Sequence, residues 1–310
     1  MKKATILRLF AALLAAAMLP FGGASCGASQ PTEQPDDKQP STEPSNAALK
    51  IMTFNVLNGW NTANIGTRDD LTAEKILALM PDVVGLQEFD DYYRNAMGTT
   101  LAEMLSEHYA EAGVEALSWN PIFYNASTLE LVQCGHEDYA VGTSYDTYVY
   151  QGQKGSRFRT IAWALFQHKA SGQRFLVCNT HFDVKEEKIP PQVAQLQSRV
   201  TELRNELGVS TVLLMGDLNS NTSSAPAQSL FDYGFQDTHE LAQTKDNSHS
   251  CGKLGEPITG TYRGAIDHVY CIGERIAVAS YVTVTDMRDA SDHCPVVVEL
   301  ELNESKKGAD

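Results

Sequence analysis

The segment TVLLMGDLNS occupies residues 211–220 and contains the clearest strand of the chain. Its aliphatic and β-branched run predicts a buried strand over Thr211–Met215, which Gly216 and Asp217 then end. A lone acid in this place is usually a turn former or a helix cap, so Asp217 by itself indicates little. The segment becomes informative because other strands of the chain end in the same way.

Apolar strands and amphipathic helices follow one another from Leu49 to Asn303. Helices are predicted at 69–80, 92–108 and 193–207. Further strands are predicted at 49–56, 82–88, 121–125, 128–132, 161–167, 174–180, 265–271, 280–285 and 295–300. Because this range shows no internal repeat and no Pro/Gly-rich gap that splits it, we expect one α+β domain of layered sheets and helices over residues 49–303.

Polar side chains gather at the ends of these strands. They are Asn55, Glu88, His181, Asp217, Asn219, Asp267, Asp292 and His293. A fold that brings the strand ends together would place six carboxylates or amides and two imidazoles in one cleft. Packed carboxylates repel one another unless a cation lies between them, and hard oxygen ligands suit Mg²⁺, Mn²⁺ or Ca²⁺. The pattern therefore predicts a divalent-metal site.

Six short blocks occur in order within residues 51–300. They read TFN (53–55), LQE (86–88), NTH (179–181), GDLN (216–219), IDHV (266–269) and SDHCP (291–295). Together they resemble the signature blocks of the endonuclease/exonuclease/phosphatase superfamily, the deoxyribonuclease I-like group of nucleases, phosphatases and sphingomyelinases. The resemblance implies an α+β fold, a four-layer α/β/β/α sandwich of two mixed sheets. It also implies metal-dependent hydrolysis of a phosphate ester by an activated water.

The resemblance assigns metal-binding roles to three of these residues. Asn55 and Glu88 would hold the divalent metal, with Glu88 as its principal carboxylate, and Asp292 would complete the cluster. Mg²⁺ is the expected cofactor, with Mn²⁺ and Ca²⁺ as alternatives. Such a metal neutralises an anionic phosphate ester that would otherwise repel hydroxide.

The same resemblance implies five catalytic residues: His293, Asp267, His181, Asp217 and Asn219. His293 would be the general base or acid, with Asp267 accepting its ring N–H, since a paired carboxylate fixes the tautomer of an imidazole. His181 would donate to a non-bridging phosphate oxygen. Asp217 and Asn219 would orient the nucleophile and contribute to a second metal site if one is used.

Three polar neighbours of these blocks are expected to have no catalytic role. His268 and Gln87 alternate with Asp267 and Glu88 along their strands, so they should face away from the site. Asp183 is expected to be a loop acid.

The segment 145–159 is basic and aromatic within an otherwise acidic chain. It carries Tyr145, Tyr148, Tyr150, Lys154, Arg157 and Arg159. One interpretation is a rim that grips phosphate and stacks on a ring, with Arg159 as the substrate-binding residue. The other is an exposed hairpin with cross-strand tyrosine pairs. The insert 243–264 is expected to be a long loop near the site that influences specificity.

Residues 1–26 have the anatomy of a secretory signal peptide. Basic residues precede an apolar run over 9–19, which is too short to span a bilayer, and small residues lead into Cys26. That end resembles a bacterial lipobox, although Gly23 departs from the pattern, so we expect lipidation of Cys26 or else cleavage near Ser25. Residues 27–48 are expected to form a disordered tether, and 304–310 a polar tail. The protein should therefore be extracytoplasmic, as a bacterial membrane-anchored lipoprotein or a secreted protein.

Composition limits the partners. The 310 residues include 24 Lys+Arg and 39 Asp+Glu, a formal net charge of −15. This balance argues against a basic nucleic-acid coat protein, but not against an enzyme that holds phosphate through metal ions. Five cysteines remain beyond Cys26, which argues against a complete disulfide framework and leaves one bridge, Cys251–Cys271, open.

Three classes of function remain. They are an extracytoplasmic nuclease, a phosphatase or sphingomyelinase-like lipid phosphodiesterase, and a catalytically inactive surface-binding module. The complete set of polar blocks argues against the third, and no long apolar hairpin suited to lipid insertion is present. We expect a monomeric Mg²⁺-dependent phosphoric ester hydrolase, a nuclease or phosphatase. Its substrate would be nucleic acid, a small phosphate or a phospholipid head group.

Overall fold

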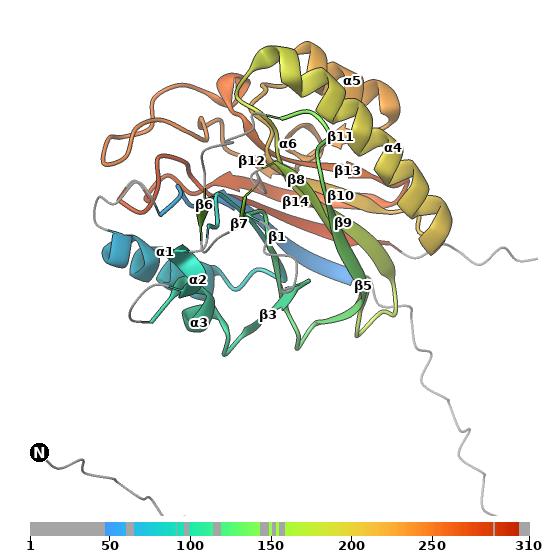
Figure 1. Ribbon diagram of the computed structural model, residues 1–310. Coiled ribbons are helices and arrows are strands. Elements are labelled where there is room, and N and C mark those ends of the chain that lie inside the picture. Colours follow the sequence, from blue (N-terminus) through green and yellow to red (C-terminus); the bar gives the residue numbers. More distant parts are fainter. Residues whose placement is uncertain are drawn as a thin grey trace, which may run out of the picture. The chain divides into compact units, whose positions relative to one another are not determined.

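The computed structural model (Figure 1) describes residues 47–59, 65–90, 92–95, 99–113, 119–142, 149–150, 153–154, 159–287 and 289–303. The chain divides into two units, Met1–Thr42 and Glu43–Asp310, and the second contains all of the described residues. The predicted signal peptide, Cys26, all but the last two tether residues and the polar tail lie outside them. No described helix is long and apolar enough to cross a membrane.

The first sheet runs in the order β12-β14-β15-β1-β2-β4-β3 within the described residues. Its strands are β1 (Ala47–Asn55), β2 (Val83–Gln87), β3 (Tyr109–Ala112), β4 (Ile122–Asn125), β12 (Thr244–Lys245), β14 (Ile276–Thr283) and β15 (Val296–Leu302). β1 pairs parallel with β2 and antiparallel with β15, so the sheet is mixed.

The second sheet runs in the order β11-β13-β10-β9-β8-β5. Its strands are β5 (Leu129–Asp138), β8 (Thr160–His168), β9 (Arg174–His181), β10 (Val212–Asp217), β11 (Gln236–Asp237) and β13 (Asp267–Ile272). It is also mixed, because β10 pairs parallel with β9 and antiparallel with β13. A short antiparallel ribbon, β6 (Val149–Tyr150) with β7 (Gln153–Lys154), stands apart from both sheets.

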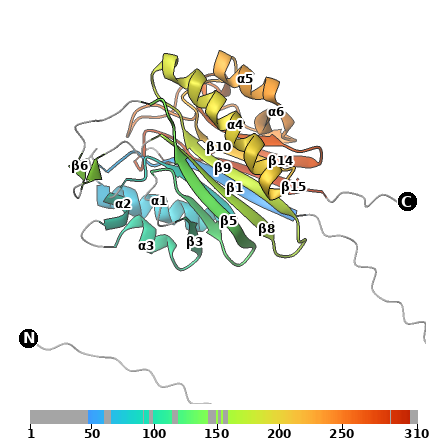
Figure 2. The ribbon, with the colours of Figure 1, turned by 45° about the vertical axis from the view of Figure 1, so that its right-hand side comes forward.

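Helices cover the outer faces of the two sheets (Figures 1 and 2). The described helices are α1 (Ile65–Leu79), α2 (Tyr92–Asn95), α3 (Leu101–Leu105), α4 (Ile189–Leu207), α5 (Ala225–Tyr233) and α6 (Thr238–Leu241), with 3₁₀ turns at η2 (Glu186–Lys188) and η3 (Tyr262–Gly264). Of these, α6 contacts strands of both sheets. α1 and α3 pack on the first sheet, and α4 packs on the second. Between the sheets lies an apolar core that includes Ile51, Val83, Val177 and Met215. This is the predicted sandwich of helix, sheet, sheet and helix layers.

One expectation about the helices is wrong, and one possibility left open for the cysteines is excluded. The helix predicted over 92–108 is divided into α2 and α3, because Thr100 begins a new helix. The Thr100 side chain accepts from the Glu103 N–H, and the Glu103 side chain accepts from the Thr100 N–H, which satisfies two donors at the helix start. The bridge considered between Cys251 and Cys271 is absent, because Cys271 is a free thiol buried on β13.

The strand directions explain why distant residues converge. β1 and β2 are parallel, as are β9 and β10, so the carboxyl ends of each pair lie at one edge of their sheet. β13 runs antiparallel to β10, and its first residue, Asp267, therefore lies opposite the last residue of β10, Asp217. The strand ends that carry the polar blocks thus meet at one end of the sandwich.

Candidate active site

Asp217 lies at the centre of the converging strand ends. In the register of the second sheet it is opposite His181 on β9 and opposite Asp267 on β13. Residues opposite one another on adjacent strands project from the same face. Leu213 and Met215, which alternate with Asp217 in steps of two, belong to the core between the sheets. All three polar side chains therefore lie at the end of the inter-sheet layer.

Gly216 permits this close approach of β10 to β9. Its φ is +151°, and a Cβ at this position would lie 1.9 Å from the carbonyl oxygen of Thr180. That atom belongs to the backbone and cannot move as a side chain could. The glycine before Asp217 is therefore required by the packing of the two strands, which explains its place in the GDLN block.

Asn55 connects the two sheets at the site. Its Nδ2 donates to Oε1 of Glu88 at 3.2 Å and to Oδ2 of Asp217 at 3.0 Å. Its Oδ1 accepts from the N–H of Leu57 at 3.0 Å. The amide thus bridges the two carboxylates as a donor, and a role for Asn55 as a metal ligand stays a prediction.

Glu88 reaches the site because the backbone turns after β2. Its φ is +59°, a left-handed conformation that interrupts the alternation of the strand. Its Oε2 accepts from the N–H of Asn58 at 2.9 Å and from Nδ2 of Asn58 at 2.6 Å. Burial alone would raise the pKa of Glu88, but nearby His181 and these hydrogen bonds hold it below its ordinary value. Asn58 was not predicted, although it stands three residues after Asn55.

Gln87 does not face away from the site, contrary to expectation. Alternation from Val83 places it on the inter-sheet side, and the left-handed turn directs Glu88 to the same region. Gln87 Nε2 donates to Oγ1 of Thr53 at 3.0 Å and to Oδ1 of Asn179 at 2.7 Å. These buried side chains form a polar layer between the apolar core and the carboxylates.

His293 and Asp267 form a hydrogen-bonded pair. Nδ1 of His293 lies 2.9 Å from Oδ2 of Asp267, and its Nε2 lies 3.7 Å from Oδ2 of Asp217. Ser250 fixes the carboxylate: its hydroxyl donates to Oδ2 of Asp267 at 2.7 Å and accepts the N–H of Asp267 at 3.1 Å. Ser250 was missed because it lies in the long insert, where no strand pattern marks it.

The charges of this cluster depend on one another. Burial would raise the pKa of Asp217, but the imidazoles of His181 and His293 hold it well below its usual range. Burial also opposes the charged form of His293, yet Asp267 and Asp217 raise its pKa to about 10. Burial and the nearby Asp217 raise the pKa of Asp267. We place the proton of the His293–Asp267 pair on the imidazole, because the second carboxylate also attracts it.

His181 and Asn219 complete the surroundings of Asp217. Nε2 of His181 lies 3.1 Å from Oδ2 of Asp217. The N–H of Asn219 donates to Oδ1 of Asp217 at 3.0 Å, and its Nδ2 donates to the carbonyl of Phe182 at 2.9 Å. Asn219 adopts a φ of +45°, which turns the chain back toward the carboxylate. Both predicted residues thus contact Asp217.

Asp292 and Arg159 lie less centrally. Asp292 is half-buried beside His293, and its carbonyl accepts from Gly252 at 2.8 Å. Arg159 is half-buried and packs near Gly142, where its Nη1 is removed from solvent and has no hydrogen-bond acceptor among the described residues. Tyr145, Tyr148 and Arg157 lie outside the described residues, so neither interpretation of segment 145–159 is decided.

The expectations for the nearby polar residues have different outcomes. His268 is structural as predicted: it is buried, and its Nε2 is 2.9 Å from the carbonyl of Ala265 and 3.2 Å from that of Ser220. Asp183 follows β9 in a loop but is fully buried, and its Oδ1 accepts from the Lys185 N–H at 3.0 Å. It therefore stabilises the loop after His181 from within.

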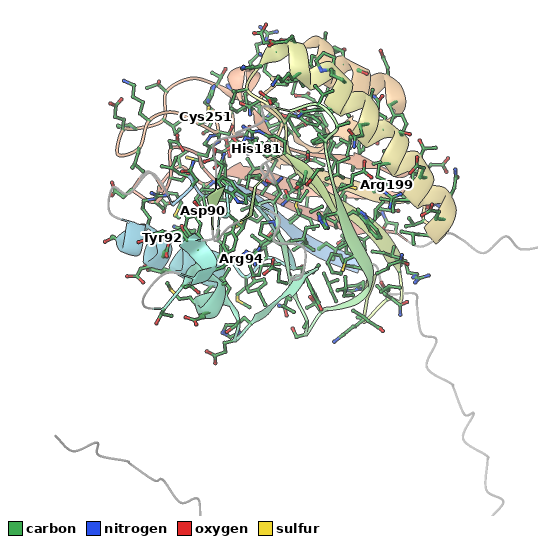
Figure 3. The ribbon with its side chains drawn as sticks, in the orientation of Figure 1. Asp90, Tyr92, Arg94, His181, Arg199 and Cys251 are labelled. Atoms are coloured by element: carbon green, nitrogen blue, oxygen red, sulfur yellow. The ribbon has the colours of Figure 1, made fainter. Side chains whose placement is uncertain are left out.

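The donor atoms fit a hard divalent cation. The carboxylates of Glu88 and Asp217 both have a lowered pKa, and both accept from the Asn55 amide. Neither forms an ion pair with a described lysine or arginine. Asp217, Asp267 and His293 also each offer one ligand atom, a carboxylate oxygen or a ring nitrogen, and these three atoms lie within 4.8 Å of one another. Because Nδ1 of His293 is already bonded to Asp267, we regard that trio as a proton-transfer group. Figure 3 labels His181 among the side chains at the end of the sandwich where the strand ends converge.

Comparisons with known proteins identify the family and agree with the fold. Residues 52–293 match the Endonuclease/Exonuclease/phosphatase family. No curated protein matches the chain. A structure of a protein of that family from Bacteroides thetaiotaomicron is similar, with a TM-score of 0.68 at 20% identity, over 84% of this chain and 100% of the other.

Two further structures share the fold. A mannosyl-6-phosphatase of Bacteroides thetaiotaomicron VPI-5482 has a TM-score of 0.65 at 21% identity, over 81% of this chain and 99% of its own. TDP2 of D. rerio, complexed with a single-strand DNA product, has a TM-score of 0.59 at 16% identity, over 82% and 99%. The family match spans most of the sequence and includes all six polar blocks, except Cys294 and Pro295 at the end of the last one. The chain belongs to the endonuclease/exonuclease/phosphatase family of phosphoester hydrolases.

Proposed function

We propose that the protein is a Mg²⁺-dependent hydrolase that removes the phosphate group from small phosphomonoesters. The observation that carries the hydrolytic activity in this proposal is the His293–Asp267 pair, which presents Nε2 of the imidazole toward the Asp217 carboxylate at 3.7 Å. A buried imidazole with a fixed tautomer can move a proton to or from a reacting oxygen. A module that only bound a surface ligand would have no use for this pair.

Each predicted residue has a role in the proposed reaction. Glu88 would hold the cation, with Asn55 and Asp292 beside it, and bound Mg²⁺ would neutralise the phosphate and favour ionised water. His293 transfers the proton, and Asp267 orients the imidazole. Asn55 holds the carboxylates of Glu88 and Asp217 next to each other across the two sheets.

The groups around Asp217 would contact the phosphate in this proposal. His181 donates to Asp217 in this structure, and a phosphate oxygen could accept the same N–H when substrate enters. Arg159 is the proposed additional phosphate contact, because its buried Nη1 has no described acceptor. Asn219 positions the nucleophile together with Asp217.

A small phosphomonoester suits the charge of the chain better than a long polyanion. The net charge of −15 gives no general attraction for nucleic acid, whose affinity depends on many cationic contacts. The mannosyl-6-phosphatase among the similar structures acts on a sugar phosphate by its name, and this supports a sugar phosphate as the first substrate to test. A nuclease is the second candidate, supported by the likeness to TDP2 with bound DNA product. A lipid phosphodiesterase has no such support.

We also propose that the enzyme acts outside the cytoplasm, anchored through a lipid on Cys26 or secreted. The support is the sequence of residues 1–26, with its basic start, apolar run and small residues before the cysteine. Radiolabelled palmitate incorporation in a bacterial host would test the anchor, with Cys26→Ser as the control that should abolish labelling.

An activity panel tests the proposed reaction. The full chain would be assayed with Mg²⁺ on mannose 6-phosphate, other sugar phosphates, a generic phosphodiester, DNA, RNA and sphingomyelin. We expect the highest kcat/KM on a sugar phosphate, loss of activity in EDTA and restoration by Mg²⁺. Activity that persists in EDTA would disprove the metal-dependent mechanism, whereas a higher kcat/KM on DNA or RNA would favour the nuclease.

A further inference from the structure

A cavity of about 940 Å³ lies at the end of the sandwich opposite the active site. Its wall includes Arg174 at the start of β9, whereas His181 ends the same strand in the active site. Seven residue steps of about 3.3 Å separate the two, roughly 23 Å. Ser210 and Thr211, just before β10, and Ile272, at the end of β13, also belong to this wall. The cavity is therefore distinct from the catalytic centre.

Three arginines give this cavity a positive lining. Arg174, Arg204 and Arg275 come from β9, from the last turn of α4 and from the turn before β14. Glu274 is the acid on the same wall. Neither Arg174 nor Arg204 forms an ion pair with a described carboxylate, although acids outnumber bases in the chain as 39 to 24. The exposed Arg174 and the half-buried Arg204 line the same cavity, so an anion bound there would be attracted to both.

Two donor atoms of the wall are buried without a partner among the described residues. Nε of Arg204 and Nε2 of Gln173 are both removed from solvent and have no hydrogen-bond partner among the described residues. A buried N–H without an acceptor costs about 1–3 kcal/mol, more when the group is charged. These two atoms are not reached from the cavity, so an oxyanion there would bind the other N–H donors of the guanidinium groups, whose fork matches phosphate oxygens.

We propose that this cavity is a second anion site, which binds the phosphate group of a ligand that is not the substrate. Two sources share this chemistry, free phosphate and the head group of an anionic phospholipid. The lipid source follows from the proposed anchor: Ala47, where β1 begins, pairs with Leu302, which lines the cavity.

Binding measurements on the full chain with Cys26→Ser, which cannot be acylated, test the site. The first arm is titration calorimetry with inorganic phosphate in EDTA. The second is co-sedimentation with vesicles of phosphatidylglycerol in phosphatidylcholine, against phosphatidylcholine alone. The test variant is Arg174→Ala with Arg204→Ala, and the charge-matched control is Lys245→Ala with Lys253→Ala, whose lysines lie outside the cavity lining. Thermal unfolding checks that each variant is folded, and the pair Arg174→Gln with Arg204→Gln replaces the alanines if they unfold the protein.

We expect the arginine variant to weaken phosphate binding at least tenfold and the lysine control to change it less than twofold. Loss of anionic-vesicle binding in the same variant would identify the lipid head group as the source, and binding of phosphate without vesicles would identify a soluble one. Equal binding by parent and arginine variant, or no binding of either probe by the parent, would overturn the site. Hydrolysis of the best ester should stay within twofold in the arginine variant, so this outcome is separable from failure of the proposed function.

Discussion

Nε of Arg68, on α1, donates to the carbonyl oxygen of Ala290 at 2.9 Å, across 222 positions of sequence. The guanidinium is fully buried, and its Nη2 also donates to the carbonyls of Val56 and Leu57 and to the hydroxyl of Tyr93. Val56 and Leu57 lead to Asn58, which holds Glu88, while Ala290 leads to the segment of His293. One side chain therefore holds together the two loops that carry opposite halves of the site.

Replacing Arg68 should reduce both stability and turnover. Arg68→Met would leave three buried carbonyls without this donor, and we expect a loss of about 3–5 kcal/mol in the free energy of unfolding. Arg68→Lys, which keeps the charge but cannot bind both loops at once, should lower kcat more than it raises KM. Urea unfolding and steady-state kinetics would measure these effects.

The matched control is Arg199→Lys, on α4 (Figure 3). Arg199 stacks over Trp163 and pairs with Glu137 and Glu202. It should leave kcat unchanged. Equal losses of kcat in the two lysine variants would show that Arg68 does not position the catalytic loops.

His293→Ala should lower kcat by about 10²–10⁴-fold and leave the fold intact, because it removes the proton-transfer group. Asp267→Asn should give a smaller loss, since the imidazole would remain with a poorly defined tautomer. The two losses should not add in the double variant, because both residues act through the same proton. Stopped assays under saturating Mg²⁺ would measure kcat, and additive losses would separate the pair functionally.

Asn55→Asp should make stability depend on the metal. The new carboxylate would lie within hydrogen-bond distance of both Glu88 and Asp217, and three anions would repel one another. We expect a lower Tm in EDTA and a larger rise in Tm on adding Mg²⁺ than the parent shows. Asn221→Asp is the control, because Oδ1 there accepts from Ser223 N–H and an aspartate can do the same. An equal Mg²⁺ response in parent and Asn55→Asp would contradict the expectation.

Gly216→Ala should be strongly destabilising. The added Cβ would lie 1.9 Å from the Thr180 carbonyl, so β9 and β10 would have to separate next to His181 and Asp217. We expect a cost of about 2–4 kcal/mol. Gly208→Ala is the control that tests backbone conformation without a steric clash, since Gly208 has a φ of +62° but open space around it. This substitution should cost about 1 kcal/mol. Chemical denaturation would compare the two; similar costs would argue against the steric explanation.

Asp69 should make stability fall as pH rises. Burial raises its pKa to about 7, with Arg68 lowering it and Asp70 and Asp90 raising it, and its Oδ1 has no described partner. Between about pH 4 and pH 7, the folded state still holds a proton on Asp69 that the unfolded state has released. The free energy of unfolding therefore decreases as the pH rises through this range. Asp69→Asn should remove this slope and stabilise the protein at pH 8 by about 1–2 kcal/mol.

The neighbouring exposed Asp70 provides the control for this measurement. Asp70→Asn should retain the parent's slope between pH 4 and pH 7. If Asp69→Asn and the parent unfold with the same pH dependence, Asp69 is ionised in the folded state at neutral pH.

The sequence by itself identified the strands that end in polar residues, because buried strands have a recognisable pattern and their polar ends interrupt it. Asp217, His181, Asp267 and His293 were predicted in this way and lie together in the structure. The sequence also indicated the layered α+β fold. Segment boundaries were less accurate, as the capping box at Thr100 shows, since local capping competes with helical periodicity.

The tertiary structure alone decided which residues support the site. Arg68 contacts Ala290 across 222 positions, and Asn55 contacts Asp217 across 162, and no local pattern reports such pairs. Ser250 and Asn58 were missed because a hydrogen bond to a distant carboxylate leaves no periodic signal. Strand alternation also failed at Glu88, because a single left-handed residue reverses the direction of its side chain. Residue types and strand ends are local properties, whereas the convergence of loops depends on how the two sheets pack.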